Sequence, residues 1–169
     1  MKKLLFITLL IGFQISAFAQ QKPCACCSEE HRQFDFWVGD WETVDSTGKV
    51  IGYNNIVIMQ DSCIIQENWN SASSPYTGTS YNFYNTTTKK WEQLWIDHGG
   101  NLLKLKGERV GNQMILYSDI AKSQKGEDYM NRVTWTANND GTVRQHWEVF
   151  KLSEDNWKTV FDGLYRKKK

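Results

Sequence analysis

Several stretches of this 169-residue chain alternate tryptophan or tyrosine with amides and carboxylates in steps of two residues. Residues two apart in a β-strand share one face of the sheet. Such a face offers flat aromatic surface together with hydrogen-bonding groups, which suits the binding of a small, partly apolar molecule. The ligand-binding side chains that this pattern predicts are Glu67, Trp69, Asn82, Tyr84, Gln93, Trp95, Gln145 and Trp147.

The intervening positions of the same stretches are mostly apolar, among them Ile64, Tyr81, Phe83, Leu94 and Ile96. A protein surface rarely carries so many tryptophans, and a dry core rarely holds so many amides and carboxylates. A hydrated cavity lined by both kinds of side chain accounts for the two facts, as in β-barrels that enclose one small ligand. The alternative is a filled polar core with internal waters, and sequence alone does not fix which face points inward.

Glu67 and Asp97 are the candidate catalytic residues if the cavity belongs to an enzyme. A carboxyl group buried among tryptophan rings has a raised pKa and can act as a general acid or base on a sugar or a lipid-like metabolite. Asp162 could join them with Arg132 or Arg144, although such pairs are more often structural. The sequence shows no serine elbow, phosphate-binding glycine loop or His-x-x-x-His pair. We therefore favour binding over catalysis, and we expect neither a cofactor nor a metal.

Placing these side chains on one face requires strands, and the sequence predicts ten of them joined by short turns. Runs of alternating residues are separated by turn signals such as 45–48 and 138–141, and no amphipathic helix of ten or more residues is evident. Sequential antiparallel neighbours are the simplest topology, which predicts an all-β, up-and-down antiparallel barrel, with a β-sandwich as the alternative. The predicted strands span 36–44, 49–59, 63–69, 76–84, 91–98, 102–109, 113–118, 129–137, 142–152 and 157–166.

The aromatic run from Phe34 to Trp41 is predicted to form the floor of this barrel. Gly39 lets the backbone bend tightly just before Trp41, whose indole would enter the core. A basic residue of the last strand would pack over that indole, and Arg166 is the expected partner. The first and last strands of the chain would then lie side by side.

The four cysteines are Cys24, Cys26, Cys27 and Cys63. In an exported chain at least one disulfide is expected, and four cysteines allow three complete pairings. We favour Cys27 with Cys63, because this bond would join the segment entering the barrel to the start of a later strand. A metal site made by the first three cysteines and His31 is the alternative, but its spacing is irregular for structural zinc.

The sequence predicts an export signal at the start of the chain and a short basic tail at its end. Residues 1–19 combine two lysines, a short apolar run and small residues at the cleavage site, and the run is too short to span a membrane. Residues 20–33 form a polar, cysteine-containing segment, 34–166 one barrel domain, and 167–169 the tail. The net charge of +1 gives no field that would attract nucleic acid or an anionic membrane.

The order and spacing of six motifs resemble an exported bacterial family known as domain of unknown function 1579 (DUF1579). The resemblance extends over nearly the whole mature chain, from about residue 32 to residue 166. It implies export and a lipocalin-like (calycin-type) barrel, and it implies no particular activity. The motifs are FDFWVGDW (34–41), CIIQENW (63–69), WEQLWID (91–97), RVTWT (132–136), VRQHWE (143–148) and FDGLY (161–165).

The family is more distantly similar to nitrobindin and the fatty-acid-binding barrels, which raises haem as a ligand. Haem needs an axial histidine inside the barrel. His146 has the opposite parity to Gln145 and Trp147, and His98 suits a rim, so we expect no haem. The expected partner is a small-molecule ligand. The alternatives are a cavity hydrolase or isomerase and a protein-interaction module that uses the rim loops 71–75 and 119–128, and the oligomeric state is left open.

Overall fold

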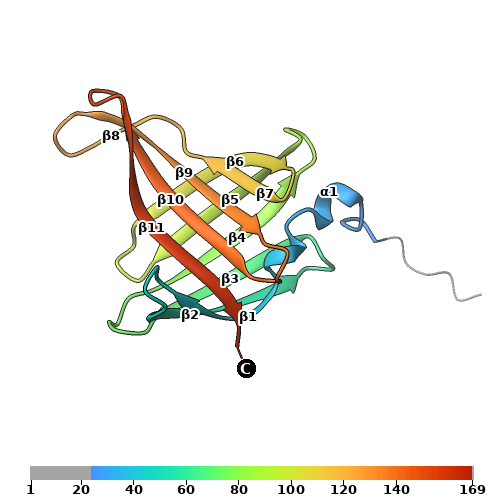
Figure 1. Ribbon diagram of the computed structural model, residues 1–169. Coiled ribbons are helices and arrows are strands. Elements are labelled where there is room, and N and C mark those ends of the chain that lie inside the picture. The colour runs from blue at the N-terminus through green and yellow to red at the C-terminus, as the bar shows by residue number, and fades with distance from the viewer. Residues whose placement is uncertain (1–23, 169) are drawn as a thin grey trace, which may run out of the picture.

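The computed structural model describes residues 24–168, which form one antiparallel sheet closed into a barrel (Figure 1). The predicted export signal, residues 1–19, lies outside the described residues. The elements are α1 (Glu29–Arg32), η1 (Asp35–Trp37), β1 (Gly39–Val44), β2 (Val50–Met59), β3 (Ile64–Ser71), β4 (Thr77–Asn85), β5 (Lys90–Asp97), β6 (Leu102–Val110), β7 (Gln113–Tyr117), β8 (Ala121–Lys122), β9 (Asp128–Ala137), β10 (Val143–Lys151) and β11 (Asn156–Lys167).

Ten strands run around the barrel in the order β10, β11, β1 to β7 and β9, and β9 pairs back with β10. The predicted antiparallel all-β barrel is therefore confirmed, and each of the ten predicted strands corresponds to one of these ten. The additional strand β8 lies within the predicted loop 119–128 and pairs only with the start of β9. Between residues 24 and 168, no helix has the length and apolar character needed to cross a membrane.

Residues 29–37, which we call the plug, cover one end of the barrel, where α1 lies in Figure 1. Phe34 and Trp37 are fully buried and stack with their ring centroids 5.0 Å apart. Trp91 of β5 and Trp135 of β9 meet Phe34 edge-on. This aromatic core is the predicted floor. It begins differently from the prediction, because residues 35–37 form η1 rather than the start of a strand.

Trp41 enters the core of the barrel as predicted, but its basic partner is Lys167 and not Arg166. Gly39 has a φ of +140°, a backbone conformation that favours glycine. The register pairs Trp41 with Lys167, whose Nζ lies 3.8 Å from the centre of the indole. The prediction of Arg166 is wrong by one residue and therefore by one face, since Arg166 lies opposite Glu42 and forms an ion pair with it there.

Two disulfides join the four cysteines, Cys24 to Cys27 and Cys26 to Cys63. The predicted pairing of Cys27 with Cys63 is wrong, because Cys27 turns back to Cys24 and leaves Cys26 to face Cys63, with Cα atoms 5.0 Å apart. The bond still links the segment before the plug to the turn before β3. With all four sulfurs bonded, no thiolate is left for a metal, and the pairing is typical of oxidising compartments.

The two disulfides differ in the loops that they close, and this difference predicts unequal contributions to stability. The bonds join residues 37 and 3 positions apart. Because the entropy of loop closure grows with the logarithm of loop length, removing the Cys26–Cys63 bond by double serine substitution should lower the free energy of unfolding by about 2 kcal/mol more than removing the Cys24–Cys27 bond. Urea unfolding of the two double variants measures this, and equal midpoints would contradict it.

Candidate functional site

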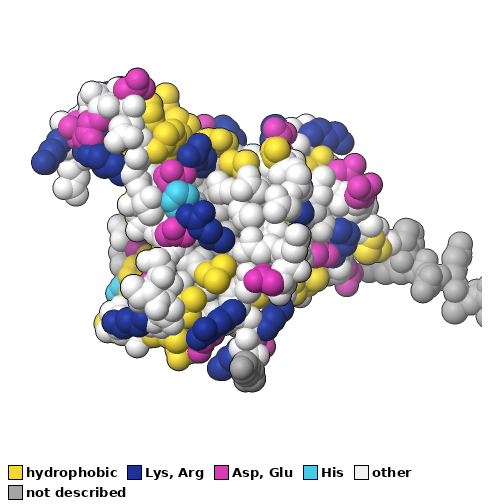
Figure 2. Space-filling model, viewed as in Figure 1, with side chains coloured by type: hydrophobic (Ala, Val, Ile, Leu, Met, Phe, Trp, Pro, Cys, Tyr) yellow, Lys and Arg dark blue, Asp and Glu magenta, His cyan; other side chains and the backbone are white. Residues whose placement is uncertain are grey.

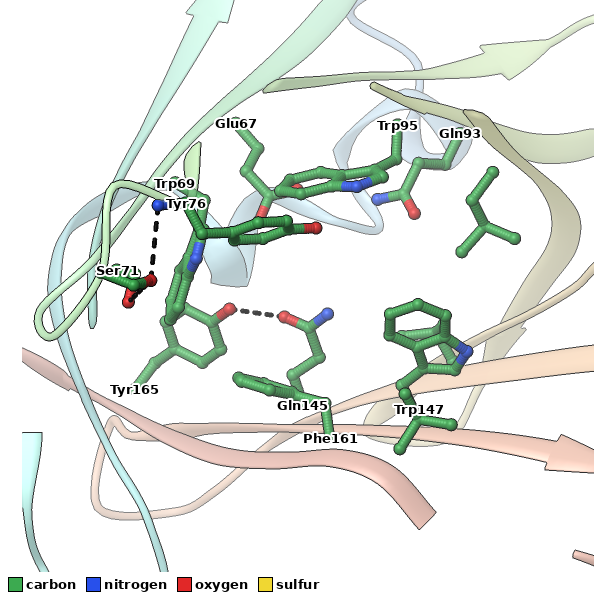
Figure 3. A pocket seen from close by; sticks show the side chains of 14 residues that line it. Glu67, Trp69, Ser71, Tyr76, Gln93, Trp95, Gln145, Trp147, Phe161 and Tyr165 are labelled. Carbon is green, nitrogen blue, oxygen red and sulfur yellow. Dashed lines mark hydrogen bonds between the residues drawn. The ribbon is translucent and has the colours of Figure 1, made fainter. Parts of the chain in front are cut away.

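A cavity of about 280 Å³ opens at the end of the barrel away from the plug. The plug contacts the last part of β4, where His31 meets Tyr84, whereas the cavity is bordered by the loop that precedes β4. Figure 3 shows two facing walls, with Trp95 and Gln93 on one and Gln145 and Tyr165 on the other. The barrel is thus filled at one end and hollow at the other.

Six of the eight predicted binding residues line this cavity: Glu67, Trp69, Gln93, Trp95, Gln145 and Trp147. The structure also decides the parity that sequence left open. The polar and aromatic face points inward, whereas Tyr81 and Ile96 of the opposite face are 39% and 40% exposed on the outside. The apolar parity is therefore the outer one.

Asn82 and Tyr84 were also predicted to line the cavity, and both predictions are wrong. Asn82 is fully buried beneath the cavity, where it bonds to protein groups. Tyr84 lies deeper still, against Trp91 and His31 at the plug. Both side chains have the inward parity, but β4 runs from the open end to the closed end, so its later residues lie below the hollow.

The cavity also includes residues that the sequence reasoning did not select, chiefly from β11 and from the loop before β4. Phe161 and Tyr165 share the inward parity, and that alternation was the available signal. Val160 could not be found in this way. It has no partner in the register, since Trp147 pairs with Phe161 and Glu148 with Thr159, and this bulge turns Val160 toward the cavity beside Phe161.

Inward-facing glycines let the large rings lie flat against the barrel wall. A Cβ atom at Gly78 would lie 2.1 Å from the indole of Trp95, and one at Gly52 would lie 2.2 Å from that of Trp69. On β11, a Cβ atom at Gly163 would lie 2.6 Å from the ring of Phe161. Each ring therefore lies against the wall at a glycine, where a larger residue would push it toward the centre of the cavity.

Glu67 lies at the base of the cavity and is only 3% exposed. Its two carboxyl oxygens accept hydrogen bonds from Asn54 Nδ2 and from Ser80 Oγ, both at 2.7 Å. These bonds lower the pKa of Glu67, but the loss of solvation on burial outweighs them and raises it to about 7. Near neutral pH this carboxyl can therefore exchange its proton, as the sequence suggested for a catalytic acid.

One arm of hydrogen bonds leads from Glu67 to Gln93. Ser80 donates to Glu67 and accepts from Asn82 Nδ2 at 2.9 Å, and Asn82 Oδ1 accepts from Gln93 Nε2 at 2.8 Å. Since the Gln93 amide nitrogen is used in this way, its carbonyl oxygen remains for a ligand.

A second arm leads from Glu67 to Gln145. Asn54 Nδ2 also reaches the Tyr165 hydroxyl at 3.4 Å, and that hydroxyl donates to Gln145 Oε1 (Figure 3). The amide nitrogen of Gln145 is thereby left for a ligand. The two amides thus present opposite hydrogen-bonding groups, an acceptor on Gln93 and a donor on Gln145.

Asp97, the other catalytic candidate, belongs to a turn and not to the cavity. Its Oδ1 accepts from the backbone N–H groups of Gly99 and Asn101, both at 2.9 Å, and its Oδ2 accepts from the Asn101 side chain. The bonds from Asn101 hold the pKa of Asp97 below its usual range, which is the opposite of what a general acid needs. The structure thus gives Asp97 the role of stabilising the turn after β5.

The other charged candidates form ion pairs on the outer wall. Arg144 donates twice to Asp162 at 2.7 Å, and Arg132 donates twice to Glu148. Figure 2 shows acidic and basic side chains side by side over this face. His146 also lies outside, 3.0 Å from Thr159, so none of the described residues that line the cavity is a histidine able to hold haem.

No model of a known protein family matches the sequence. A search of curated proteins also finds no match.

Proposed function

We propose that this protein binds one small, partly apolar molecule in the cavity of the barrel. The observation that carries the proposal is the pair of amides on opposite walls, each fixed by hydrogen bonds on one edge and open to the cavity on the other, between rings that glycines hold flat. The rings supply contact area and the amides orient the ligand, and sites for small ligands typically combine these two kinds of group.

We further propose that the protein is exported and is a lipocalin-like member of the DUF1579 family. Each of the six motifs behind this resemblance falls on the plug or on a strand of the barrel. Residues 34–41 run from the plug into β1, and residues 161–165 belong to β11, which pairs with β1. Export to the periplasm or beyond is supported by the two disulfides and by the sequence of residues 1–19.

A cavity enzyme is the second candidate, and Glu67 is the observation that favours it. This carboxyl is buried at the base of the cavity and has a pKa of about 7, which suits a general acid or base. A binder should return its ligand unchanged. An enzyme should release an altered product and lose turnover in Glu67→Gln.

Native mass spectrometry of protein purified from its own host tests the binding proposal directly. A copurifying small molecule, retained by the wild-type chain, is the expected result. The neutral dye N-phenyl-1-naphthylamine serves as an independent probe, because its fluorescence rises in apolar surroundings and it quenches nearby tryptophans. Absence of both a copurifying molecule and dye binding would contradict the proposal.

Gly78→Ala should close the cavity while leaving the fold intact. The new methyl group would meet the Trp95 ring at 2.1 Å, so the indole must swing off the wall into the space that a ligand needs. We expect dye affinity to fall by about tenfold or more, equivalent to about 1.4 kcal/mol. Gly99→Ala is the matched control, since its Cβ would meet nothing closer than 3.3 Å. Equal dye affinities in the two variants would contradict the prediction.

A further inference from the structure

We propose that the ligand is an organic cation, a compact amine or quaternary ammonium compound whose positive charge lies among the cavity rings above Glu67. This inference rests on the proposed binding function and names the chemical class of the ligand. Three features of the cavity carry it: the faces of its rings, the distribution of charge around it, and the open edges of its amides.

Aromatic rings form much of the cavity wall. Trp69 and Trp95 line the cavity and lie against Gly52 and Gly78, and Trp69 also packs at steep angles against Phe161 and Tyr165. Trp147 and Tyr76 add further aromatic wall (Figure 3). The face of an aromatic ring carries negative charge and attracts cations, and tryptophan does so most strongly.

The charges that surround the cavity are of one sign. Glu67 is the one carboxyl group among the described residues that line it, and no lysine, arginine or histidine of residues 24–168 does so. An anionic ligand would therefore find no counter-charge there. A cation would find both the ring faces and, in the ionised state, the carboxylate of Glu67.

Glu67 has no cationic partner in the protein. Its hydrogen bonds come from Asn54 and Ser80, which are neutral. The titratable groups that face it are Tyr165 of β11 and Tyr76 of the loop before β4. Burial raises the pKa of both tyrosines. The charge of Glu67 adds to this at Tyr165, whereas at Tyr76 the charge of Asp97 adds more than that of Glu67. Neither tyrosine can supply a positive charge.

Two other carboxylates of the barrel are, by contrast, paired with arginine. On the outer wall, Asp162 is bonded to Arg144 and Glu148 to Arg132. A positive charge would be worth more beside the buried carboxyl of Glu67 than beside these more exposed groups, because burial removes most of its solvation. A bound cation would supply the missing partner.

The open edges of the two amides fit an amine as well. The carbonyl oxygen of Gln93 can accept a hydrogen bond from an ammonium N–H, while the amide nitrogen of Gln145 can donate to a neutral oxygen elsewhere on the ligand. The cavity volume of about 280 Å³ favours a compact body over a long chain.

The test compares matched ligands that differ in charge. At pH 8, 2-phenylethylamine should bind at least about tenfold more tightly than the neutral 2-phenylethanol, and choline should exceed its carbon analogue 3,3-dimethyl-1-butanol by a similar factor, as followed by tryptophan fluorescence. Glu67→Gln should reduce both preferences to about twofold or less. Glu108→Gln, which removes an exposed carboxylate of β6, should leave them unchanged.

Calorimetry of the wild-type protein gives a second readout that needs no variant. A cation above Glu67 stabilises its ionised form, so at pH 6 to 7 binding of 2-phenylethylamine should release a fraction of a proton, seen as heats that differ between buffers of different ionisation enthalpy. At pH 9, where Glu67 is already ionised, the release should vanish.

Neutral analogues that bind as well as the cations, or a cation preference that persists in Glu67→Gln, would overturn the inference. If the amines fail while N-phenyl-1-naphthylamine binds and is sensitive to Gly78→Ala, the cation inference is wrong and the binding function stands. If none of these probes binds and no molecule copurifies, both proposals are wrong.

Discussion

Trp37→Ala is expected to lower the free energy of unfolding by about 3–5 kcal/mol, which is a large part of the total for a domain of this size. Trp37 is fully buried and packs between Phe34 and Trp135, at centroid distances of 5.0 and 5.3 Å. Its indole N–H has no hydrogen-bond partner within the described part of the chain, so the loss is one of packing alone. Phe34 and Trp135 pack against Trp37 itself, so its removal leaves a cavity between them that the plug cannot fill. Urea unfolding followed by circular dichroism measures the change.

Trp157→Ala is the matched control for this prediction. Trp157 lies on β11. Arg132 packs over its ring at 4.1 Å, and the ring of Phe150 lies 5.1 Å away at an angle of 45°. Its side chain is only partly buried, so its loss should cost about 1 kcal/mol. If the two variants unfold at the same urea concentration, the plug does not stabilise the barrel as we describe.

The stability of the protein should fall as pH rises from about 5 to 8, and Glu67 should account for a decrease of about 3 kcal/mol. Its pKa rises from 4.5 to about 7 on folding, a difference of about 2.5 units, and each unit corresponds to about 1.4 kcal/mol. Below pH 4.5 the group is protonated in both states. Between the two values the unfolded chain releases the proton while the folded chain keeps it, so unfolding becomes more favourable. Above pH 7 the loss is complete.

Glu67→Gln isolates this contribution from that of the other carboxyl groups. The difference in unfolding free energy between Glu67→Gln and wild type should grow in favour of the variant by about 3 kcal/mol between pH 5 and 8. The pKa values of Asp97 and Asp162 are lowered by their hydrogen bonds, so these two groups lower the stability as the pH falls. Their contribution is the same in both proteins and therefore does not affect the difference. Glu108→Gln provides the exposed control. A difference that does not change with pH would contradict the prediction.

A buried carboxyl that destabilises the folded protein at neutral pH needs a functional reason. Glu67 fixes the direction of both hydrogen-bond arms, because an ionised carboxylate only accepts and thus obliges Ser80 and Asn54 to donate to it. The arms then leave an acceptor on Gln93 and a donor on Gln145. The stability that Glu67 costs is consistent with a site selected for binding rather than for packing.

Local patterns along the chain were enough to predict the strands, their antiparallel order and most of the cavity lining. This was possible because a strand places alternate residues on one face. Trp69 therefore shares a face with Glu67, and Trp95 with Gln93, whichever face points into the barrel. Turn residues marked the ends of these strands. Both signals are local, and local signals can be read from a single chain.

The folded barrel was needed to establish which face points inward, how deep each residue lies and which side chains are partners. Asn82 shares its face with the cavity residues but lies below them. Lys167, and not Arg166, lies opposite Trp41 because of the register between β1 and β11. The choice of Cys26 over Cys27 depends on how the chain turns before the plug. These outcomes depend on height along the barrel axis and on register between strands far apart in sequence, and alternation along one strand carries no information about either.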